Sequence, residues 1–324
     1  MRRSMVVVAI ALVVATVVFA QSKPALKIAF NTWVGYGPLY IAQDKGFFDQ
    51  LGIEVRMTRI EDTASKGATL KAKRLDGVGT TADSQVIAAS QGIPGIICLA
   101  MDESAGADGV IAVNTVASVK DLKGRSVAVQ QGFVGHFFLL YLLDEAGLSP
   151  KDIVVQDMET DQAGAAFVAK KVDAAVTWEP WLSKTKERAD AHVVITSKDK
   201  PGLIVDVLAM RDDVIKNRPE DVKKLIQGWY MGVDYWKKNQ ADGNAIIAKN
   251  FGLETGAVAE MLSGVNLFDA RGNLDYFGTA AAPGQIYKVV AKANEVWQKA
   301  GLMKVSVDTK KIVDGSLVNQ IGAK

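Results

Sequence analysis

The sequence predicts an α/β protein with two lobes and a helical C-terminal part. Short β-rich runs alternate with helical patterns over residues 26–113, and a second such series covers residues 119–210. From Pro219 onward the patterns are almost wholly helical. Strands that alternate with helices are typical of a largely parallel sheet with helices on both faces. A chain of 324 residues is long enough for two such units.

The first series predicts five strands and three helices. Alternating apolar and polar residues indicate a half-buried strand at 53–59, and Pro38 and Gly46 are typical of a helix start and a helix end. The expected strands are 26–31, 53–59, 77–80, 96–100 and 110–113. The expected helices are 38–48, 63–73 and 82–91.

The second series repeats this alternation before the helical part begins. Its expected strands are 126–129, 153–158, 173–177, 192–196 and 203–210. Its expected helices are 132–146, 161–170 and 178–188. The C-terminal part predicts helices at 219–239, 244–251, 254–265, 283–300 and 308–314.

Two crossings between the lobes are expected, at the strands Val110–Val113 and Val205–Met210. They divide the chain into lobe I, residues 25–112 plus 208–324, and lobe II, residues 113–207. A cleft between two such lobes is a usual place for a small ligand. The strand ends and helix starts of the two sheets would line it.

The N-terminus predicts a signal peptide at residues 1–20. Arg2 and Arg3 precede the uncharged run Met5–Ala20, and the chain turns polar at Gln21. The alternative is a membrane anchor, but the run is shorter than the roughly 20 apolar residues that cross a bilayer core. No cysteine follows the cleavage site, which argues against a lipoprotein. We therefore expect a freely diffusing periplasmic protein of a Gram-negative cell.

The charge balance argues against a nucleic-acid-binding protein, and the cysteine count argues against a disulfide-bonded one. The chain has 38 Lys and Arg against 36 Asp and Glu, so it lacks the basic footprint of a nucleic-acid-binding protein. Cys98 is the sole cysteine, so no internal disulfide can form. Because Cys98 lies in an apolar run, we interpret it as a packed core thiol.

No catalytic constellation can be named. His136 and His192 are far apart in sequence, and no zinc-protease, nucleophile-elbow or phosphate-loop motif is present. The sequence therefore predicts a protein that is not an enzyme, with no catalytic residue, no metal site and no cofactor.

The junctions between strands and helices carry the candidate ligand-binding residues. The loop after the first strand contains two glycines and displays aromatic side chains just before a helix. A hydroxyl and a carboxylate follow the third strand, where helix capping is the alternative role. From these two junctions the candidates are Trp33, Gly35, Tyr36, Thr81, Ala82 and Asp83.

The second series adds two junctions and one strand residue. The backbone N–H groups at the helix start after residue 131 could hold an anion. An aromatic residue and an acid end another strand and suit a polar or cationic solute, although paired tryptophans can also be core packing. A carboxylate inside an apolar strand needs a partner. These candidates are Gly132, Phe133, Val134, His136, Trp178, Glu179 and Asp206.

Six segments in this order resemble the periplasmic substrate-binding proteins of ABC importers, in the nitrate/sulfonate/taurine (NMT1/THI5-like) group. The resemblance implies a type II periplasmic-binding-protein fold, with two α/β lobes joined by a two-segment hinge. It also implies a small-molecule ligand held by the junctions above, the transmembrane subunits of an ABC permease as partner, and a monomer. The segments are WVGYGPLYIAQDKGFF (33–48), LGIEV (51–55), TTADS (80–84), VKDLKGRSVAVQQG (119–132), VDAAVTWEPW (172–181) and DVLAMRDDVIKNRPEDVKKLIQGW (206–229).

The expected function is delivery of a small polar solute to the permease. Asp83, Glu179 and Asp206 are acidic, so a free inorganic anion would be repelled if they face the cleft. A taurine-like zwitterion or a nitrogen-rich small molecule fits this charge better. Two alternatives stay open: a ligand-sensing module for a membrane receptor, and a pyrimidine synthase of the same group. The single cysteine argues against the synthase, whose chemistry depends on a cysteine-rich motif.

Overall fold

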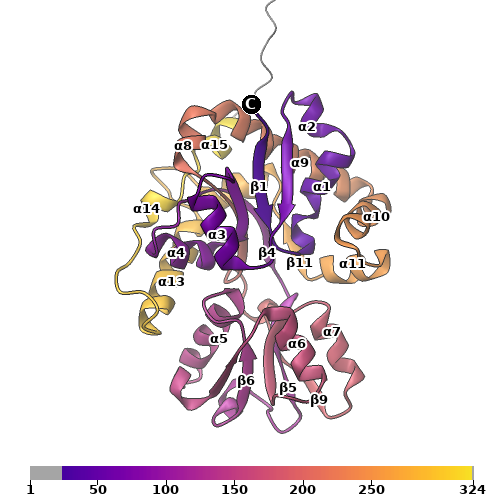
Figure 1. The fold of residues 1–324 in the computed structure, drawn as a ribbon, viewed down its shortest axis with the longest axis vertical. Coiled ribbons are helices and arrows are strands. Elements are labelled where there is room, and N and C mark those ends of the chain that lie inside the picture. Colours follow the sequence, from indigo (N-terminus) through magenta and orange to yellow (C-terminus); the bar gives the residue numbers. More distant parts are fainter. Residues whose placement is uncertain (1–23, 323–324) are drawn as a thin grey trace, which may run out of the picture.

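The computed structural model describes residues 24–322 and contains two β-sheets, one in each lobe (Figure 1). The predicted signal peptide lies outside the described residues. The first sheet has the strand order β11 (Val265–Leu267), β4 (Ile96–Ser104), β10 (Val205–Met210), β3 (Gly77–Thr81), β1 (Leu26–Phe30) and β2 (Val55–Arg59). The second has the order β7 (Val154–Asp157), β6 (Ser126–Val129), β8 (Ala174–Trp178), β5 (Asp108–Val113) and β9 (Ala191–Thr196).

The chain passes between the two sheets in two short segments. It leaves the first sheet after β4 and returns to it between β9 and β10. Strand β5 was expected at the crossing between the lobes, but it lies wholly in the second sheet. The chain therefore passes from the first sheet to the second a few residues before the predicted boundary at residue 112. The predicted lobe limits remain predictions, because sheet membership alone does not define a rigid lobe.

Both sheets are mixed, whereas the sequence predicts a largely parallel arrangement. The β1–β2, β1–β3, β6–β7 and β6–β8 pairs are parallel. By contrast, β10 is antiparallel to β3 and β4, and β5 is antiparallel to β8 and β9. Strands β5 and β10 enter their sheets directly from the other lobe without a crossover helix, and only a crossover returns a strand in the parallel sense.

The helices of the first series lie close to their expected positions. The predicted helix 38–48 is two helices in the structure, separated at Gly46, whose φ of 69° is the left-handed conformation that glycine adopts without strain. The segments are the 3₁₀ turn η1 (Val34–Tyr36), α1 (Gly37–Asp44), α2 (Phe47–Gln50), α3 (Thr63–Lys71) and α4 (Ala82–Ser90).

In the second lobe, the predicted helix 178–188 is shorter than expected. Trp178 ends strand β8, and the helix begins only after Pro180. The helices are α5 (Val134–Glu145), α6 (Thr160–Val168) and α7 (Trp181–Lys184). Four 3₁₀ turns complete the lobe and the return crossing: η2 (Val119–Leu122), η3 (Pro150–Asp152), η4 (Thr185–Glu187) and η5 (Ser197–Asp199).

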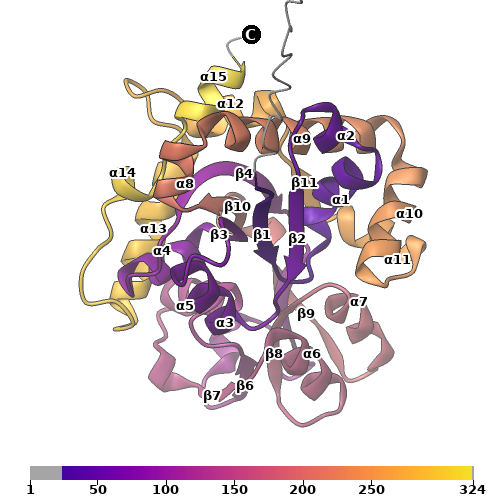
Figure 2. The same cartoon turned by 45° about the horizontal axis from the view of Figure 1, so that its top comes forward.

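The C-terminal helices return to the first lobe and cover it, as the orange and yellow ribbons in Figure 2 show. Strand β11 and the helices α8, α12 and α15 differ from the prediction, which did not include them, because a strand of 3 residues and helices of 6 to 8 residues are too short for a clear periodic signal. The helices are α8 (Asp212–Asn217), α9 (Pro219–Lys238), α10 (Gln240–Phe251), α11 (Thr255–Leu262), α12 (Ala270–Phe277), α13 (Gln285–Lys299), α14 (Thr309–Ile312) and α15 (Ser316–Gly322).

Helix α13 joins the hydrophobic cores of the two lobes. It packs on α4 in the first lobe and on α5 in the second. Cys98 is fully buried on β4, which confirms its interpretation as a core thiol. None of the helices within residues 24–322 is long and apolar enough to cross a membrane.

Candidate functional site

Aromatic side chains from the two lobes meet where the sheets face each other. Trp33 follows β1 in the first lobe, and its ring centroid lies 6.3 Å from that of Trp178, at the end of β8 in the second. Phe133, which precedes α5, lies 6.1 Å from the same Trp178 ring. Edge contacts at these distances are favourable ring geometries. The aromatic groups therefore close the space between the lobes.

A narrow pocket lies beside these rings, and its side chains leave a volume of only about 10 Å³ for the centre of a water-sized molecule. We refer to it as the inner pocket. Its lining includes seven of the candidate residues: Trp33, Tyr36, Thr81, Phe133, Val134, Trp178 and Asp206. It also includes three residues that the sequence analysis did not select: Asn31, Asp108 and Ile204.

Strand register explains why distant parts of the chain meet here. Strand β10 runs antiparallel, so its first residues lie beside the carboxyl end of β3, and Asp206 is opposite Thr81. In the second sheet Asp108, the first residue of β5, is opposite Trp178. Both aspartates thus stand where the chain enters a sheet from the other lobe. That shared position is the sequence signal that could have found Asp108.

Two further contacts fix the first-lobe side of the inner pocket. The Tyr36 hydroxyl donates a hydrogen bond to Asp206, and Trp33 Nε1 donates to Asp102 at 3.2 Å. A Cβ atom on Gly35 would overlap both the Asp102 carboxylate and the Trp33 indole. Glycine is therefore required at position 35 for this close approach. Gly35 shapes the pocket wall without lining the pocket.

Burial leaves the acidic groups of this region with raised pKa values. Burial, opposed in part by the Trp33 hydrogen bond, raises the pKa of Asp102 to about 8. It raises the pKa of Asp108 to about 7 and that of Asp83 to about 6. The pKa of Asp206 lies well above its ordinary value because of burial and the neighbouring Asp102. Clustered buried carboxylates are costly for folding and are typical of functional sites.

Glu179 and His136 are not among the residues that line the inner pocket. The Glu179 carboxylate accepts hydrogen bonds from the backbone N–H and the hydroxyl of Ser183, each at 3.0 Å. His136 is 5% exposed, and its ring lies 5.9 Å from that of Trp297. Its Nδ1 accepts a hydrogen bond from the N–H of Gly132, and burial lowers the pKa of His136 to about 4. The structure therefore gives Glu179 and His136 partners within the chain.

Ala82 and Asp83 are buried at the start of α4, behind the inner pocket. The Asp83 backbone carbonyl accepts a hydrogen bond from Trp297 Nε1 at 3.0 Å. The capping alternative for Thr81 and Asp83 finds no support in the structure: Thr81 is the N-cap residue of α4, but no side-chain hydrogen bond caps the helix. The Thr81 hydroxyl donates instead to the hydroxyl of Ser84.

The model of the NMT1-like family matches residues 20–250 of the sequence. The chain belongs to this family. A binding protein of Brucella abortus (strain 2308) is 26% identical over 214 residues, which cover 64% of this chain and 66% of that protein. The taurine-binding periplasmic protein of Escherichia coli (strain K12) is 24% identical over 253 residues, 73% of this chain and 78% of that protein.

Solved structures show the same fold as this NMT1-like chain. The periplasmic aliphatic sulphonate binding protein SsuA from Escherichia coli superposes with a TM-score of 0.75 at 18% identity, over 90% of this chain and 92% of that one. The prediction of a periplasmic-binding-protein fold is therefore confirmed. The match with the Brucella relative spans just under two thirds of that protein's length.

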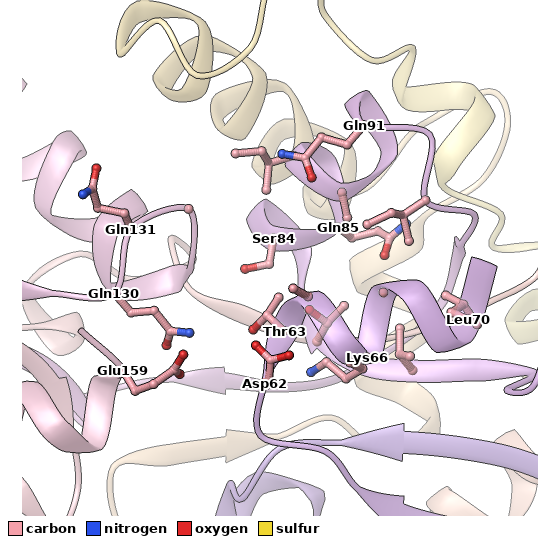
Figure 3. Close-up of a pocket in the computed structure, with 18 of the residues that line it drawn as sticks. Asp62, Thr63, Lys66, Leu70, Ser84, Gln85, Gln91, Gln130, Gln131 and Glu159 are labelled. Atoms are coloured by element: carbon pink, nitrogen blue, oxygen red, sulfur yellow. The ribbon is translucent and has the colours of Figure 1, made fainter. Parts of the chain in front are cut away.

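In this NMT1-like protein a second, larger space opens beside the inner pocket, with a volume of about 540 Å³ for the centre of a water-sized molecule. We refer to it as the outer chamber. Figure 3 shows Gln130 and Glu159 of the second lobe facing Asp62 and Ser84 of the first. Gly132, the remaining candidate, lines this chamber and not the inner pocket. Both lobes therefore contribute polar side chains to the outer chamber.

Lys66 marks the boundary between the two spaces. It lines the outer chamber, and its Nζ donates to Asn31 Oδ1 at 3.3 Å and to the Gly79 carbonyl at 3.2 Å. Asn31 in turn lines the inner pocket. Burial lowers the pKa of Lys66 to about 8. No group of three or more His, Cys, Asp or Glu side chains arranged to hold a metal ion occurs within residues 24–322.

The raised pKa of Asp102 predicts a pH-dependent effect of Asp102→Asn on stability. Native Asp102 keeps a proton that the unfolded chain releases above about pH 4. The contribution of Asp102 to the free energy of unfolding is therefore greatest below pH 4. It decreases as the pH rises toward 8, the pKa of Asp102 in the folded protein. Asparagine does not ionise, so position 102 of the variant contributes no such decrease in the free energy of unfolding as the pH rises. Its side-chain oxygen can still accept the Trp33 hydrogen bond. We expect Asp102→Asn to raise the free energy of unfolding at pH 8, by at least about 1 kcal/mol.

Urea unfolding of both proteins at pH 5 and pH 8 measures this difference. The gain should be larger at pH 8 than at pH 5. His136 has the opposite pH dependence, but it is common to both proteins and cancels in the comparison. A gain that is equal at both pH values, or larger at pH 5, would contradict the assignment of a protonated native Asp102.

Proposed function

We propose that this protein is a periplasmic solute-binding protein that delivers a small polar solute to an ABC permease. One observation carries the proposal: aromatic rings and carboxylates from both lobes converge on one pocket at the strand ends. Such an arrangement binds a ligand only when the two lobes come together. Named relatives that bind taurine or sulfonates in the periplasm support the compartment and the type of function.

The mechanism follows from where the contacts lie. Trp33, Tyr36 and Asp206 belong to the first lobe, and Phe133 and Trp178 belong to the second. A solute that contacts both sets interacts more strongly with the closed arrangement than with the open one. This differential affinity shifts the population toward closure. The permease then recognises the closed, loaded form, and the solute is a taurine-like zwitterion or another nitrogen-rich small molecule.

The expected result for Trp178→Ala is loss of solute affinity by about tenfold or more, because truncating a central aromatic contact typically costs more than 1 kcal/mol. The measurement is calorimetric titration with taurine, alkanesulfonates, nitrate and pyrimidines, alongside intrinsic tryptophan fluorescence. Since Trp33 and Trp178 lie in the pocket, binding should change the emission.

Trp181→Ala is the matched control in the same lobe. Trp181 is partly exposed, and its Nε1 donates to Asp161 outside the inner pocket. Its removal should change affinity by less than about threefold. Equal losses in the two variants would place the solute outside the inner pocket. Failure of every solute in the panel to bind the unmodified protein would count against solute binding itself.

A further inference from the structure

The inner pocket holds more acidic than basic side chains. Asp108 and Asp206 line it and are 5% and 4% exposed. Asp102 lies directly behind, opposite Asp206 in the β4–β10 register. The ammonium group at its border, Lys66, is already held by an amide oxygen and a backbone carbonyl. This one ammonium group can balance the charge of only one of these carboxyls when they ionise.

We propose that the solute carries a cationic nitrogen, as an organic ammonium, amidinium or protonated heterocycle, which binds between Asp108 and Asp206 against the rings of Trp33 and Trp178. This inference rests on the proposed function and specifies the ligand class for the same pocket. A zwitterion satisfies it through its amino group, whereas nitrate or a simple alkanesulfonate does not.

The rings and the carboxylates favour the same kind of ligand. The face of an indole ring attracts a cation, and the attraction strengthens when water is excluded. A buried carboxylate pairs with a cation through short, charge-assisted hydrogen bonds. Trp33, Trp178 and Phe133 supply the apolar walls, and Asp108 and Asp206 supply the acceptors. A cation favours the ionised form of these carboxyls, whereas an inorganic anion would be repelled by them once they ionise.

The loop expected to hold an anion is partly occupied by its own contacts. The Gly132 N–H donates to His136 Nδ1 at 3.1 Å. The Gln131 N–H donates to the Asp157 carboxylate at 2.9 Å. These two N–H groups precede Phe133, the N-cap residue of α5, so the loop before the helix is held by contacts within the chain.

An unpartnered acceptor beside the pocket provides an independent observation. Asp83 is 1% exposed, and its Oδ1 has no hydrogen-bond donor among the described residues. Asp83 interacts electrostatically with both Asp108 and Asp206. A buried acceptor without a donor is costly. Asp83 does not line the inner pocket itself, so a ligand cation would act on it through electrostatic attraction and not as a hydrogen-bond donor.

Binding of a cation should release protons. The titratable groups around Asp206 are Asp83 on α4, Asp102 on β4, Asp108 on β5, Tyr36 on η1 and Lys66 on α3. A cation favours the ionised carboxylates, whose pKa values are raised by burial. Lys66, with a pKa lowered to about 8, loses its repulsive charge as the pH rises. Both effects make cation affinity increase from pH 5.5 to pH 8.

Three ligands of similar shape test the inference: benzamidine as the cation, benzamide as the neutral analogue and benzenesulfonate as the anion. Calorimetric titration of the full protein is expected to show at least about tenfold tighter binding of benzamidine than of the other two. Affinity for benzamidine should be greater at pH 8 than at pH 5.5. Taurine and choline extend the comparison to aliphatic cations.

Two variants connect the effect to the proposed groups. Asp108→Asn and Asp206→Asn should each weaken benzamidine binding by at least about tenfold, because each removes one charge of a desolvated pair. Asp49→Asn, on the exposed surface of α2, should leave it unchanged. Circular dichroism and the thermal midpoint confirm that each variant is folded.

The outcomes separate the two proposals. Binding of benzenesulfonate, nitrate or ethanesulfonate without binding of any cation overturns the cation inference and leaves solute binding intact. Cation binding that is unchanged in both aspartate variants also overturns it. Binding of neither class, in the presence of folded protein, counts against the cation inference and the proposed function together.

Discussion

Replacing Trp297 by alanine is expected to lower the free energy of unfolding by about 3–5 kcal/mol. Trp297 lies on α13 and is fully buried, and its ring centroid is 5.8 Å from that of Phe137 on α5. Its Nε1 donates a hydrogen bond to the Asp83 carbonyl on α4 at 3.0 Å. Truncation therefore removes a large buried ring and leaves a buried carbonyl without its donor. Because these partners belong to both lobes, the loss affects the whole molecule.

Urea unfolding monitored by circular dichroism measures this effect, with Trp297→Phe as the matched variant. Phenylalanine keeps most of the ring packing but lacks the N–H donor, so its cost should be smaller than that of alanine. A Trp297→Ala cost below about 1 kcal/mol would show that the site collapses without a cavity. Such a result would contradict the role of Trp297 in joining the lobes.

The second large effect is expected for Asn273→Leu, at about 2–5 kcal/mol. Asn273 on α12 is fully buried, and its side chain makes two hydrogen bonds with the backbone of Ala100 on β4. Its Oδ1 accepts from the Ala100 N–H and its Nδ2 donates to the Ala100 carbonyl, each at 2.9 Å. The last residue of β11, Leu267, pairs with Asp102. The Asn273 amide thus supplies backbone partners to β4 beyond the end of β11.

Leucine has a similar size but no polar atoms, so both Ala100 groups would be left buried without a partner. The measurement is again equilibrium unfolding, with Asn250→Leu as the control. Asn250 donates to the Ile246 carbonyl of its own helix and is partly exposed, so water can replace its amide. The control should cost less than about 1 kcal/mol. Equal costs for the two variants would contradict the special role of Asn273.

The sequence predicted the aromatic half of the candidate site. Trp33, Tyr36, Phe133 and Trp178 stand at strand-to-helix junctions, and such junctions lie at one edge of an α/β sheet whatever the detailed topology. Their convergence on one pocket follows from local pattern and fold class. The same reasoning selected Glu179, which does not line the inner pocket and whose carboxylate accepts hydrogen bonds from Ser183, a contact that only the structure shows.

The alternation of strands and helices, the two series and the helical C-terminal part were set by the sequence itself, because hydrophobic period and helix signals are local properties. The positions of the acidic side chains in and behind the pocket depend on the tertiary structure. Strands β10 and β5 enter antiparallel from the opposite lobe, which places Asp206 beside Thr81 and Asp102, and Asp108 beside Trp178. Such register depends on hydrogen bonds between segments far apart in sequence, and the burial that raises carboxylate pKa values exists only once those segments pack.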